Sequence, residues 1–560
     1  MEKMTRKEYD VVVIGSGAAG LTAALTAKLE GLSVLLIEKT ELFGGSTALS
    51  GGAIWIPNNI YLVEAGLKYS DEEILEYMQS TVGDDTPKVL QKAYLERGVE
   101  MVEYLRDRTE VKWSYVKGYA DYYSSRSGGK DEGRTIEAKI FNLKRLGENR
   151  KFLRRANLAT KGMVLCAKEF HDINMMTRSL RGVLQGAKVV FRLAREILSF
   201  GAYRPISLGE AVVARLMFSY SKLKGEYWLS TRLVEFIREP DDELTIKGVI
   251  VEKDNSLFEI RAKRGVVIAT GGFSRNQELR ERYLPKPTST EWTLAAEGQT
   301  GDIIEKAINL GAELKFMANV WGTPSVLFPG GIAYMPVAER AVPGMIIVDH
   351  QGSRYMNEVT PYHEFLDRMY LHNSEDVNRS IPSWYLFDKR SKNRYLLFGA
   401  LPLLPFPSRW KREGFVKKAT TLEGLAKELN IPSDALKSTV DKYNNYAKDS
   451  IDREFARGET AHDRYYGDKR LKNPNYAPLN KAPYYAVALY PGDIGTKGGL
   501  VMDEFARVLS KEGKVFRGLY AAGNASASVM GRTYPGAGAT IGSAMTFGYI
   551  AAKHMLTLDR

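Results

Sequence analysis

The chain has 560 residues, 44% of them hydrophobic and 26% charged, with a formal net charge of +12. This length exceeds what one hydrophobic core can organise, so two or three domains are expected. The single cysteine, Cys166, excludes an intramolecular disulfide and a cysteine metal cluster, and the six histidines are too scattered to predict a metal site.

The surplus of positive charge favours an anionic partner, for which nucleic acid and an anionic membrane surface are the candidates. No nucleic-acid-binding motif accompanies the charge, so no nucleic acid partner is predicted. Residues 1–15 hold a short apolar run without a cleavage site, and no stretch of about 18 or more apolar residues occurs. We therefore expect no signal peptide, no transmembrane helix and a place on the cytoplasmic side.

Residues 9–39 have the pattern strand, glycine turn, helix, strand. The strands are predicted at 10–14 and 33–38, with a helix from about Ala18 to Leu29 between them. This unit opens an α/β fold with a Rossmann-like domain.

The glycine turn carries the signature of a dinucleotide site. Gly15, Gly17 and Gly20 match G-x-G-x-x-G, which allows a tight turn, close approach to a pyrophosphate and packing of helix on strand. The helix N-terminus offers N–H groups to the phosphates. Glu38, which ends the second strand, is placed to accept hydrogen bonds from a ribose.

Three later segments favour FAD over NAD as the cofactor. Residues 44–47, 269–272 and 522–524 resemble the repeated cofactor contacts of flavoproteins, and no second G-x-G-x-x-G offers a nicotinamide site. The predicted FAD-binding residues are Gly15, Ser16, Gly17, Ala18, Ala19, Gly20, Glu38, Lys39, Gly45, Ser46, Thr47, Ser50, Gly51, Gly52, Val234, Ala269, Thr270, Gly271, Asn524, Gly538, Thr540 and Ile541.

Further along, the pattern predicts a second domain inserted into the first. Short strands are expected at 249–252 and 258–264, before a separate buried strand at 265–272. A final strand precedes a last helix from about Ala539 to Leu556. We expect a discontinuous FAD-binding domain formed by 1–275 and 488–560, and an inserted α+β catalytic domain at 276–487.

Residues 534–538 (Tyr-Pro-Gly-Ala-Gly) carry the chemistry. The Tyr534 hydroxyl and the Gly538 backbone N–H can both donate to one ketone oxygen and so stabilise an enolate as it forms. An enolate site joined to a redox cofactor predicts oxidation of a carbon–carbon bond beside a carbonyl.

The chain resembles the 3-ketosteroid Δ1-dehydrogenases, within the wider fumarate-reductase-like flavoproteins, except at roughly 145–210. The segments that carry the resemblance are 44–47 (Gly-Gly-Ser-Thr), 121–123 (Asp-Tyr-Tyr), 357–362 (Asn-Glu-Val-Thr-Pro-Tyr), 493–499 (Asp-Ile-Gly-Thr-Lys-Gly-Gly) and 533–538 (Thr-Tyr-Pro-Gly-Ala-Gly). The family often has proline where this chain has Ala537.

This resemblance implies roles for four residues. Tyr534 and the Gly538 N–H would bind the C3 ketone of a 3-keto-4-ene steroid, a class that extends to cholest-4-en-3-one types. Tyr362 would remove the C2 proton, with Tyr122 as its hydrogen-bond partner, while the C1 hydride passes to flavin N5. A quinone is the implied electron acceptor.

Other functions stay open at this point. A 3-ketosteroid Δ4-(5α)-dehydrogenase would oxidise C4–C5 instead. A fumarate-type reductase needs an arginine proton donor and cationic clamps, whereas residues 321–328 (Trp-Gly-Thr-Pro-Ser-Val-Leu-Phe) are aromatic and apolar. A non-catalytic, membrane-binding flavoprotein scaffold is the alternative from another class.

Residues 150–210 form a basic segment with amphipathic helical spacing. Its apolar positions include Met176, Leu180, Val183, Leu184, Ala187, Phe191, Ala194 and Leu198, and its basic positions are Lys151, Arg154, Arg155, Lys161, Lys168, Arg178, Arg181, Lys188, Arg192 and Arg195. Such a helix can lie in a membrane interface, or pack its apolar stripe on its own protein. The first interpretation predicts peripheral membrane attachment, with substrate entering from lipid.

Overall fold

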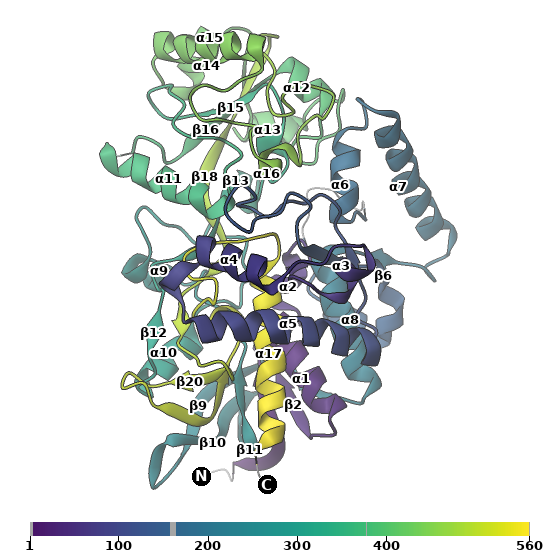
Figure 1. Cartoon of the computed structure of the whole chain (residues 1–560), viewed down its shortest axis with the longest axis vertical. Coiled ribbons are helices and arrows are strands. Elements are labelled where there is room, and N and C mark those ends of the chain that lie inside the picture. Colours follow the sequence, from purple (N-terminus) through teal and green to yellow (C-terminus); the bar gives the residue numbers. More distant parts are fainter. Residues whose placement is uncertain (1–3, 157–163, 377, 559–560) are drawn as a thin grey trace.

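The described part of the chain is built around two large β-sheets, which lie in the lower and upper halves of Figure 1. The structure is a computed structural model that describes residues 4–156, 164–376 and 378–558. Lys161, one of the predicted basic residues, lies outside these ranges.

The lower sheet has the strand order β20-β21-β10-β11-β1-β2-β8, with β9 paired to β10. Its strands are β1 (Thr5–Ile14), β2 (Val34–Ile37), β8 (Glu226–Trp228), β9 (Thr231–Glu239), β10 (Asp242–Lys253), β11 (Ser256–Ile268), β20 (Arg507–Leu509) and β21 (Val515–Ala521). The run from β21 through β11, β1 and β2 to β8 is parallel, which confirms the Rossmann-like fold. The separate strand expected at 265–272 was wrong, because β11 runs through Gly265, which pairs with Val11.

Helices α1 (Ala18–Leu29) and α17 (Ala539–Thr557) cover one face of this sheet and contact each other. The predicted first helix is confirmed, and its alanine and glycine positions let it pack closely between α17 and α8 (Leu208–Lys222). Helix α5 (Lys88–Arg108) crosses α17 on the outside (Figure 1). The last helix therefore returns the chain to its first helix.

The upper sheet has the strand order β14-β13-β18-β16-β15, with β17 paired to β18. Its strands are β13 (Val320–Phe328), β14 (Ile332–Tyr334), β15 (Met345–Val348), β16 (Ser383–Asp388), β17 (Lys417–Ala419) and β18 (Tyr484–Thr496). Its covering helices include α11 (Tyr362–Glu375), α14 (Leu422–Leu429) and α15 (Ser433–Asp449). The predicted boundary at 487/488 falls inside β18, so the pairing of the upper sheet continues to Thr496.

The remaining helices and short strands connect the two large sheets and cover their surfaces. They are α2 (Gly45–Leu49), β3 (Ala53–Trp55), α3 (Ile60–Glu64), α4 (Asp71–Thr81), η1 (Gly83–Asp85), β4 (Trp113–Tyr115), β5 (Thr135–Ala138), β6 (Phe141–Asn142), η2 (Leu143–Phe152), β7 (Pro205–Ile206), α9 (Gln277–Tyr283), α10 (Asp302–Asn309), β12 (Leu314–Lys315), η3 (Glu339–Ala341), α12 (Lys389–Arg394), α13 (Ser408–Arg412), α16 (Ala461–Arg464), β19 (Gly499–Leu500) and η4 (Gly523–Ala525).

The basic segment contains helices α6 (Ala167–Asn174) and α7 (Leu180–Leu198), which stand at the edge of the molecule (Figure 1). The apolar stripe of α7 does not pack against the body of the protein. Its buried residues are Gly182, Gln185 and Val189, whereas its large apolar side chains face outward. The exposed side chains are Leu180, Val183, Leu184, Val190, Phe191, Leu193, Ile197 and Leu198.

Among the described residues, we find no helix with both the length and the apolar character needed to span a bilayer.

Candidate active site

A cavity of about 410 Å³ runs from the glycine turn after β1 to the aromatic residues beside the upper domain. Tyr122, Tyr362, Tyr534 and Gly538 line it, together with every predicted FAD-binding residue except Gly20 and Val234. Segments far apart in the sequence thus meet around one space, and its volume suits a ligand site.

Gly20 and Val234, the two predicted FAD-binding residues that do not line the cavity, are placed differently. A Cβ on Gly20 would lie 1.8 Å from the Gly15 carbonyl oxygen, so this glycine serves the packing of α1 against the turn. Val234 follows Leu233 in β9, and Leu233 is among the lining residues while Val234 is not. Gly15 itself has a φ of +106°, and a Cβ there would lie 2.3 Å from the Ala269 carbonyl oxygen.

The turn residues fit a dinucleotide. Gly17 caps α1 without a side chain, and the first turn of the helix lines the cavity. The Ala18 N–H donates to Thr47 Oγ1 at 3.0 Å. The Glu38 carboxylate is already oriented, because Oε2 accepts from the Ser16 hydroxyl at 2.6 Å and Oε1 accepts from the Thr40 N–H at 3.0 Å. These residues would hold the ribose and pyrophosphate of FAD.

At the other end of the cavity, three predicted tyrosines form one aromatic cluster. The Tyr122 ring centre lies 5.2 Å from that of Tyr362 and 5.1 Å from that of Tyr534, in edge-to-face contacts. Tyr362 and Tyr534 lie 6.4 Å apart. The structure therefore brings together side chains from three segments that are far apart in the sequence.

The loop that carries Tyr534 is held in place by buried hydrogen bonds. The Pro535 carbonyl accepts from the Tyr77 hydroxyl at 2.6 Å and from the Tyr122 N–H at 3.0 Å. Next to Tyr122, Asp121 forms a fully buried ion pair with Arg134 at 2.5 Å. These contacts fix Tyr122 and Tyr534 relative to each other.

Glycine is the one residue type that fits at position 538. Its φ is +94°, and a Cβ would lie 2.4 Å from the Ala53 carbonyl carbon and oxygen. It is also the N-cap of α17, so its N–H stands at the positive end of that helix.

Burial controls the acidity of the tyrosines. It raises the pKa of Tyr534 to about 12, while the Thr540 hydroxyl and the Gly538 N–H act on the same phenol in the opposite direction. Tyr534 and Gly538 both line the cavity, as two donors to one ketone oxygen must. Burial, with Tyr119 beside it, raises the pKa of Tyr362 well above its usual range, and the guanidinium of Arg340 opposes that rise.

Sequence reasoning missed several lining residues. Tyr119 and Tyr466 line the cavity, and Tyr119 stacks on Tyr465 with ring centres 4.3 Å apart. The start of the basic segment contributes Leu165, Cys166, Ala167 and Phe170. No motif marks these positions in the sequence, although the Tyr465-Tyr466 pair is one signal that could have been used.

Tyr123 and His363 lie apart from the lining residues. The Tyr123 hydroxyl hydrogen-bonds His363 Nε2 at 2.9 Å, and both side chains are buried. His363 is thus a packed partner of Tyr123 and not a surface residue. In the described ranges, no group of three or more His, Cys, Asp or Glu side chains could hold a metal ion.

Comparisons with known proteins identify the family. The FAD binding domain family matches residues 10–541. The chain is 40% identical to a 3-oxosteroid 1-dehydrogenase of Mycolicibacterium smegmatis over 98% of this chain and 97% of that protein. A protein of the same name from Mycobacterium tuberculosis is 40% identical over 99% of both chains. The chain belongs to the 3-ketosteroid Δ1-dehydrogenase family.

A solved structure of this family agrees closely with the fold. The 3-ketosteroid Δ1-dehydrogenase from Sterolibacterium denitrificans, in complex with 1,4-androstadiene-3,17-dione, is 39% identical, with a TM-score of 0.93 over 98% of this chain and 99% of that one. Membership in the family confirms the predicted FAD cofactor and the predicted enzyme class. The roles of individual site residues stay predictions.

Proposed function

We propose that the protein uses FAD to introduce the C1–C2 double bond into 3-keto-4-ene steroids. The observation that supports this best is the convergence of Tyr122, Tyr362 and Tyr534 on the cavity that also contains the dinucleotide cradle. The full-length relatives named 3-oxosteroid 1-dehydrogenase favour this function over a Δ4-(5α)-dehydrogenase or a fumarate-type reductase.

In this proposal, each end of the cavity has its own task. The Tyr534 hydroxyl and the Gly538 N–H donate to the C3 ketone oxygen, which makes the C2 proton more acidic. Tyr362 takes that proton, and Tyr122 relays it. FAD, when bound, supplies the acceptor for the C1 hydride. The apolar and aromatic lining excludes water and orients the steroid rings.

The decisive experiment is an anaerobic titration of the FAD-loaded protein with androst-4-ene-3,17-dione. Loss of the oxidised-flavin absorption, together with formation of the 1,4-diene, is the expected result. A bound flavin that stays oxidised would reject the steroid assignment. Reduction by 5α-steroids with formation of the 4-ene would instead favour the Δ4 activity. For turnover, a quinone is the proposed acceptor, and reoxidation of the reduced protein by quinone analogues tests that step separately.

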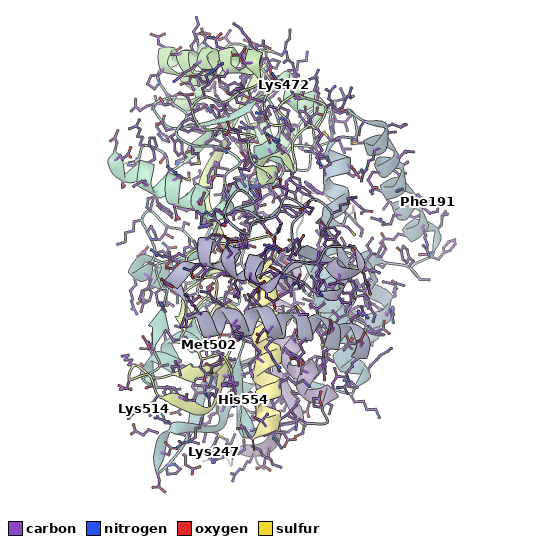
Figure 2. The ribbon with its side chains drawn as sticks, in the orientation of Figure 1. Phe191, Lys247, Lys472, Met502, Lys514 and His554 are labelled. Carbon is purple, nitrogen blue, oxygen red and sulfur yellow. The ribbon has the colours of Figure 1, made fainter. Side chains whose placement is uncertain are left out.

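We also propose that α7 rests on an anionic membrane. Phe191, labelled at the edge of the molecule in Figure 2, is 71% exposed, and Leu180 is 75% exposed. Exposed apolar surface of this extent is unusual on a protein that stays in water. Leu165, Cys166, Ala167 and Phe170 of the same segment line the cavity, so this segment joins the proposed membrane surface to the substrate site.

The positive charges in α7 and just before it are less available than the sequence suggests. Arg178, Arg181 and Arg192 form ion pairs with Asp468, Asp172 and Glu169. Apolar insertion should therefore contribute more to membrane binding than charge does, with roughly 0.8 kcal/mol for each buried methylene.

Sedimentation with anionic liposomes tests this proposal. Phe191→Ser combined with Ile197→Ser should release the protein from the liposomes. Leu257→Ser, at an exposed apolar position on β11, is the matched control and should still sediment. Equal sedimentation of the α7 variant and the control would reject membrane attachment through α7.

A further inference from the structure

Arg340 is buried directly against the proposed base. It lies in η3 (Glu339–Ala341) and is 1% exposed. Its guanidinium carbon is 4.9 Å from the centre of the Tyr362 ring and 5.4 Å from the centre of the Phe365 ring. Both rings belong to α11, so Arg340 packs against the first turn of that helix.

The hydrogen bonds of Arg340 go to backbone and not to a carboxylate. Nη1 donates to the carbonyls of Glu358 and Thr360, at 3.0 Å each. Nε has no partner, and no ion pair involves Arg340, within the described residues. An unpaired buried cation is costly in free energy, so its retention at this position calls for a reason.

The neighbouring buried arginines show how such charges are normally paired in this domain. Arg354 forms ion pairs with Glu358 at 2.8 Å and with Asp452 at 2.8 Å. Arg457 pairs with Glu358 at 3.2 Å. The Glu358 carboxylate is thus taken by two other arginines, and Arg340 bonds only the backbone carbonyl of Glu358. The other buried carboxyl beside Arg340 is that of Glu339, which accepts from the Phe398 N–H and the Tyr334 hydroxyl.

On its other side, the base has no strong stabiliser of negative charge. The groups that face Tyr362 are the phenols of Tyr119, Tyr122, Tyr466 and Tyr534, and of these Tyr122 favours the phenolate by a hydrogen bond. The His462 ring lies behind Tyr122 with ring centres 4.9 Å apart. Burial and Tyr119 both disfavour the phenolate, and among the groups that act on Tyr362 the Arg340 guanidinium is the one full positive charge. A base that starts as phenol could not accept the C2 proton.

We propose that Arg340 is the counter-ion of the Tyr362 phenolate and lowers the cost of ionising this base before the steroid loses its C2 proton. The proton then moves from C2 to the Tyr362 oxygen, the electron pair of the C–H bond passes into the enolate, and the guanidinium becomes an unpaired cation again. Arg340 touches neither substrate nor cofactor, so it is a positioning residue. This inference rests on the proposed function of Tyr362.

The pH profile of anaerobic, single-turnover flavin reduction tests the inference. In Arg340→Gln, the acid limb of the rate should move up by about 1–3 pH units, which is the usual effect of losing an opposite charge beside an ionisable group. At pH values below this limb, each further decrease of one pH unit lowers the rate about tenfold. Arg340→Lys keeps a positive charge and should restore most of the shift.

A purely structural role would give another result. Arg457→Gln removes a buried arginine of the same domain, and we expect it to lower thermal stability without moving the acid limb. If Arg340→Gln does not fold, Arg340→Lys is compared with Tyr362→Phe by ultraviolet difference titration of tyrosinate. Loss of one tyrosinate transition in Tyr362→Phe, and its persistence close to the wild-type pH in Arg340→Lys, are then expected.

The outcomes separate this inference from the proposed function. If Tyr362→Phe reduces its flavin at the wild-type rate, Tyr362 is not the base and the proposed function fails at that residue. If Tyr362→Phe is inactive but both Arg340 variants keep the wild-type acid limb, Arg340 is not the counter-ion and only the present inference is overturned.

Discussion

The ring of Tyr122 meets the ring of Tyr362 edge to face, with centres 5.2 Å apart and an angle of 83° between the planes. Tyr122 also contacts Tyr534 at 5.1 Å. It therefore stands between the group proposed to take a proton and the group proposed to bind the ketone, and each tyrosine can be tested without changing the shape of the cluster.

Removing the Tyr362 hydroxyl should abolish most activity. In Tyr362→Phe, we expect flavin reduction by 3-keto-4-ene steroids to slow by about 10²–10⁴-fold, because a general base contributes that much. Tyr122→Phe should cause a smaller loss, since it removes only the relay. Stopped-flow absorbance measures both. The control is Tyr355→Phe, a buried tyrosine bonded to Ser383, which should react like the wild type. An unchanged rate in Tyr362→Phe would contradict the assignment.

The Tyr534 hydroxyl should matter for the chemical step more than for FAD binding. Because one donor to a developing oxyanion is worth about 10²–10³ in rate, Tyr534→Phe should lower kcat by that factor. The flavin content of the purified variant should equal that of the wild type. A variant that loses FAD and keeps its rate per bound flavin would place Tyr534 in cofactor binding instead.

Alanine at Gly538 should be far worse than alanine at another glycine with the same backbone conformation. Gly311 has a φ of +89° and no atom within 4 Å of the place that a Cβ would take, whereas a Cβ on Gly538 would meet Ala53 at 2.4 Å. Gly311→Ala should cost about 1–2 kcal/mol of stability and keep activity. Gly538→Ala should lose steroid-dependent flavin reduction, and comparable activity of the two variants would argue against a special role for Gly538.

The Glu38 carboxylate should set the affinity for FAD. It lines the cavity and accepts from the N–H and hydroxyl groups of Ser16 and Thr40, and we expect a ribose hydroxyl to compete for one of these positions. A hydrogen bond to a charged group contributes about 1.5–3 kcal/mol, so Glu38→Gln should weaken FAD binding by about 10–100-fold. Fluorescence titration of the apoprotein with FAD measures the Kd. Glu41→Gln, at an exposed neighbouring position, should leave the Kd unchanged.

Lys497 should make stability depend on pH. It is fully buried, donates to the Thr533 carbonyl at 2.5 Å and lies 4.5 Å from the Trp321 ring centre. Burial lowers the pKa of Lys497 to about 7, although Asp367 and Asp85 partly oppose this. Between this value and the unfolded pKa of about 10.4, the unfolded chain holds a proton that the folded chain has lost, so this residue makes stability rise with pH.

Lys497→Met should remove that dependence. The free energy of unfolding of the wild type, relative to that of the variant, should increase by up to about 1.4 kcal/mol per pH unit above pH 7. Thermal melting of both FAD-loaded proteins across this range gives the comparison. Lys514→Met, at an exposed position marked in Figure 2, should melt in parallel with the wild type at every pH. Parallel curves for Lys497→Met would contradict the lowered pKa.

The local sequence patterns predicted the cofactor half of the molecule well. The helix at Ala18–Leu29 was expected with the bounds that it has, because a glycine turn and a run of small residues leave little choice. Glu38, Gly15 and the glycines after Phe43 were placed on one site because each motif has its own physical purpose there. Each of these short motifs requires a particular local geometry, so that geometry can be predicted from the motif alone.

These local patterns could not predict which residues far apart in the sequence come into contact. Nothing near Arg340 in the sequence indicates that its guanidinium would face Tyr362, since that contact depends on how η3 packs against α11. Tyr466 is one of 31 tyrosines, and the sequence did not distinguish it from the others. For α7, the helix was correctly predicted. The sequence alone did not show that its large apolar side chains would be left exposed, because that depends on which elements pack against the helix.

The return of the chain to its first helix also affects how the protein is made. The glycine turn and α1 are synthesised first, but β21 and α17, which cover them and complete the cavity, are synthesised last. A growing chain therefore leaves the ribosome with an unfinished nucleotide cradle, and we expect FAD to bind only after these last residues have been made. A premature stop shortly before α17 would thus yield a protein that lacks flavin altogether, not a slower enzyme.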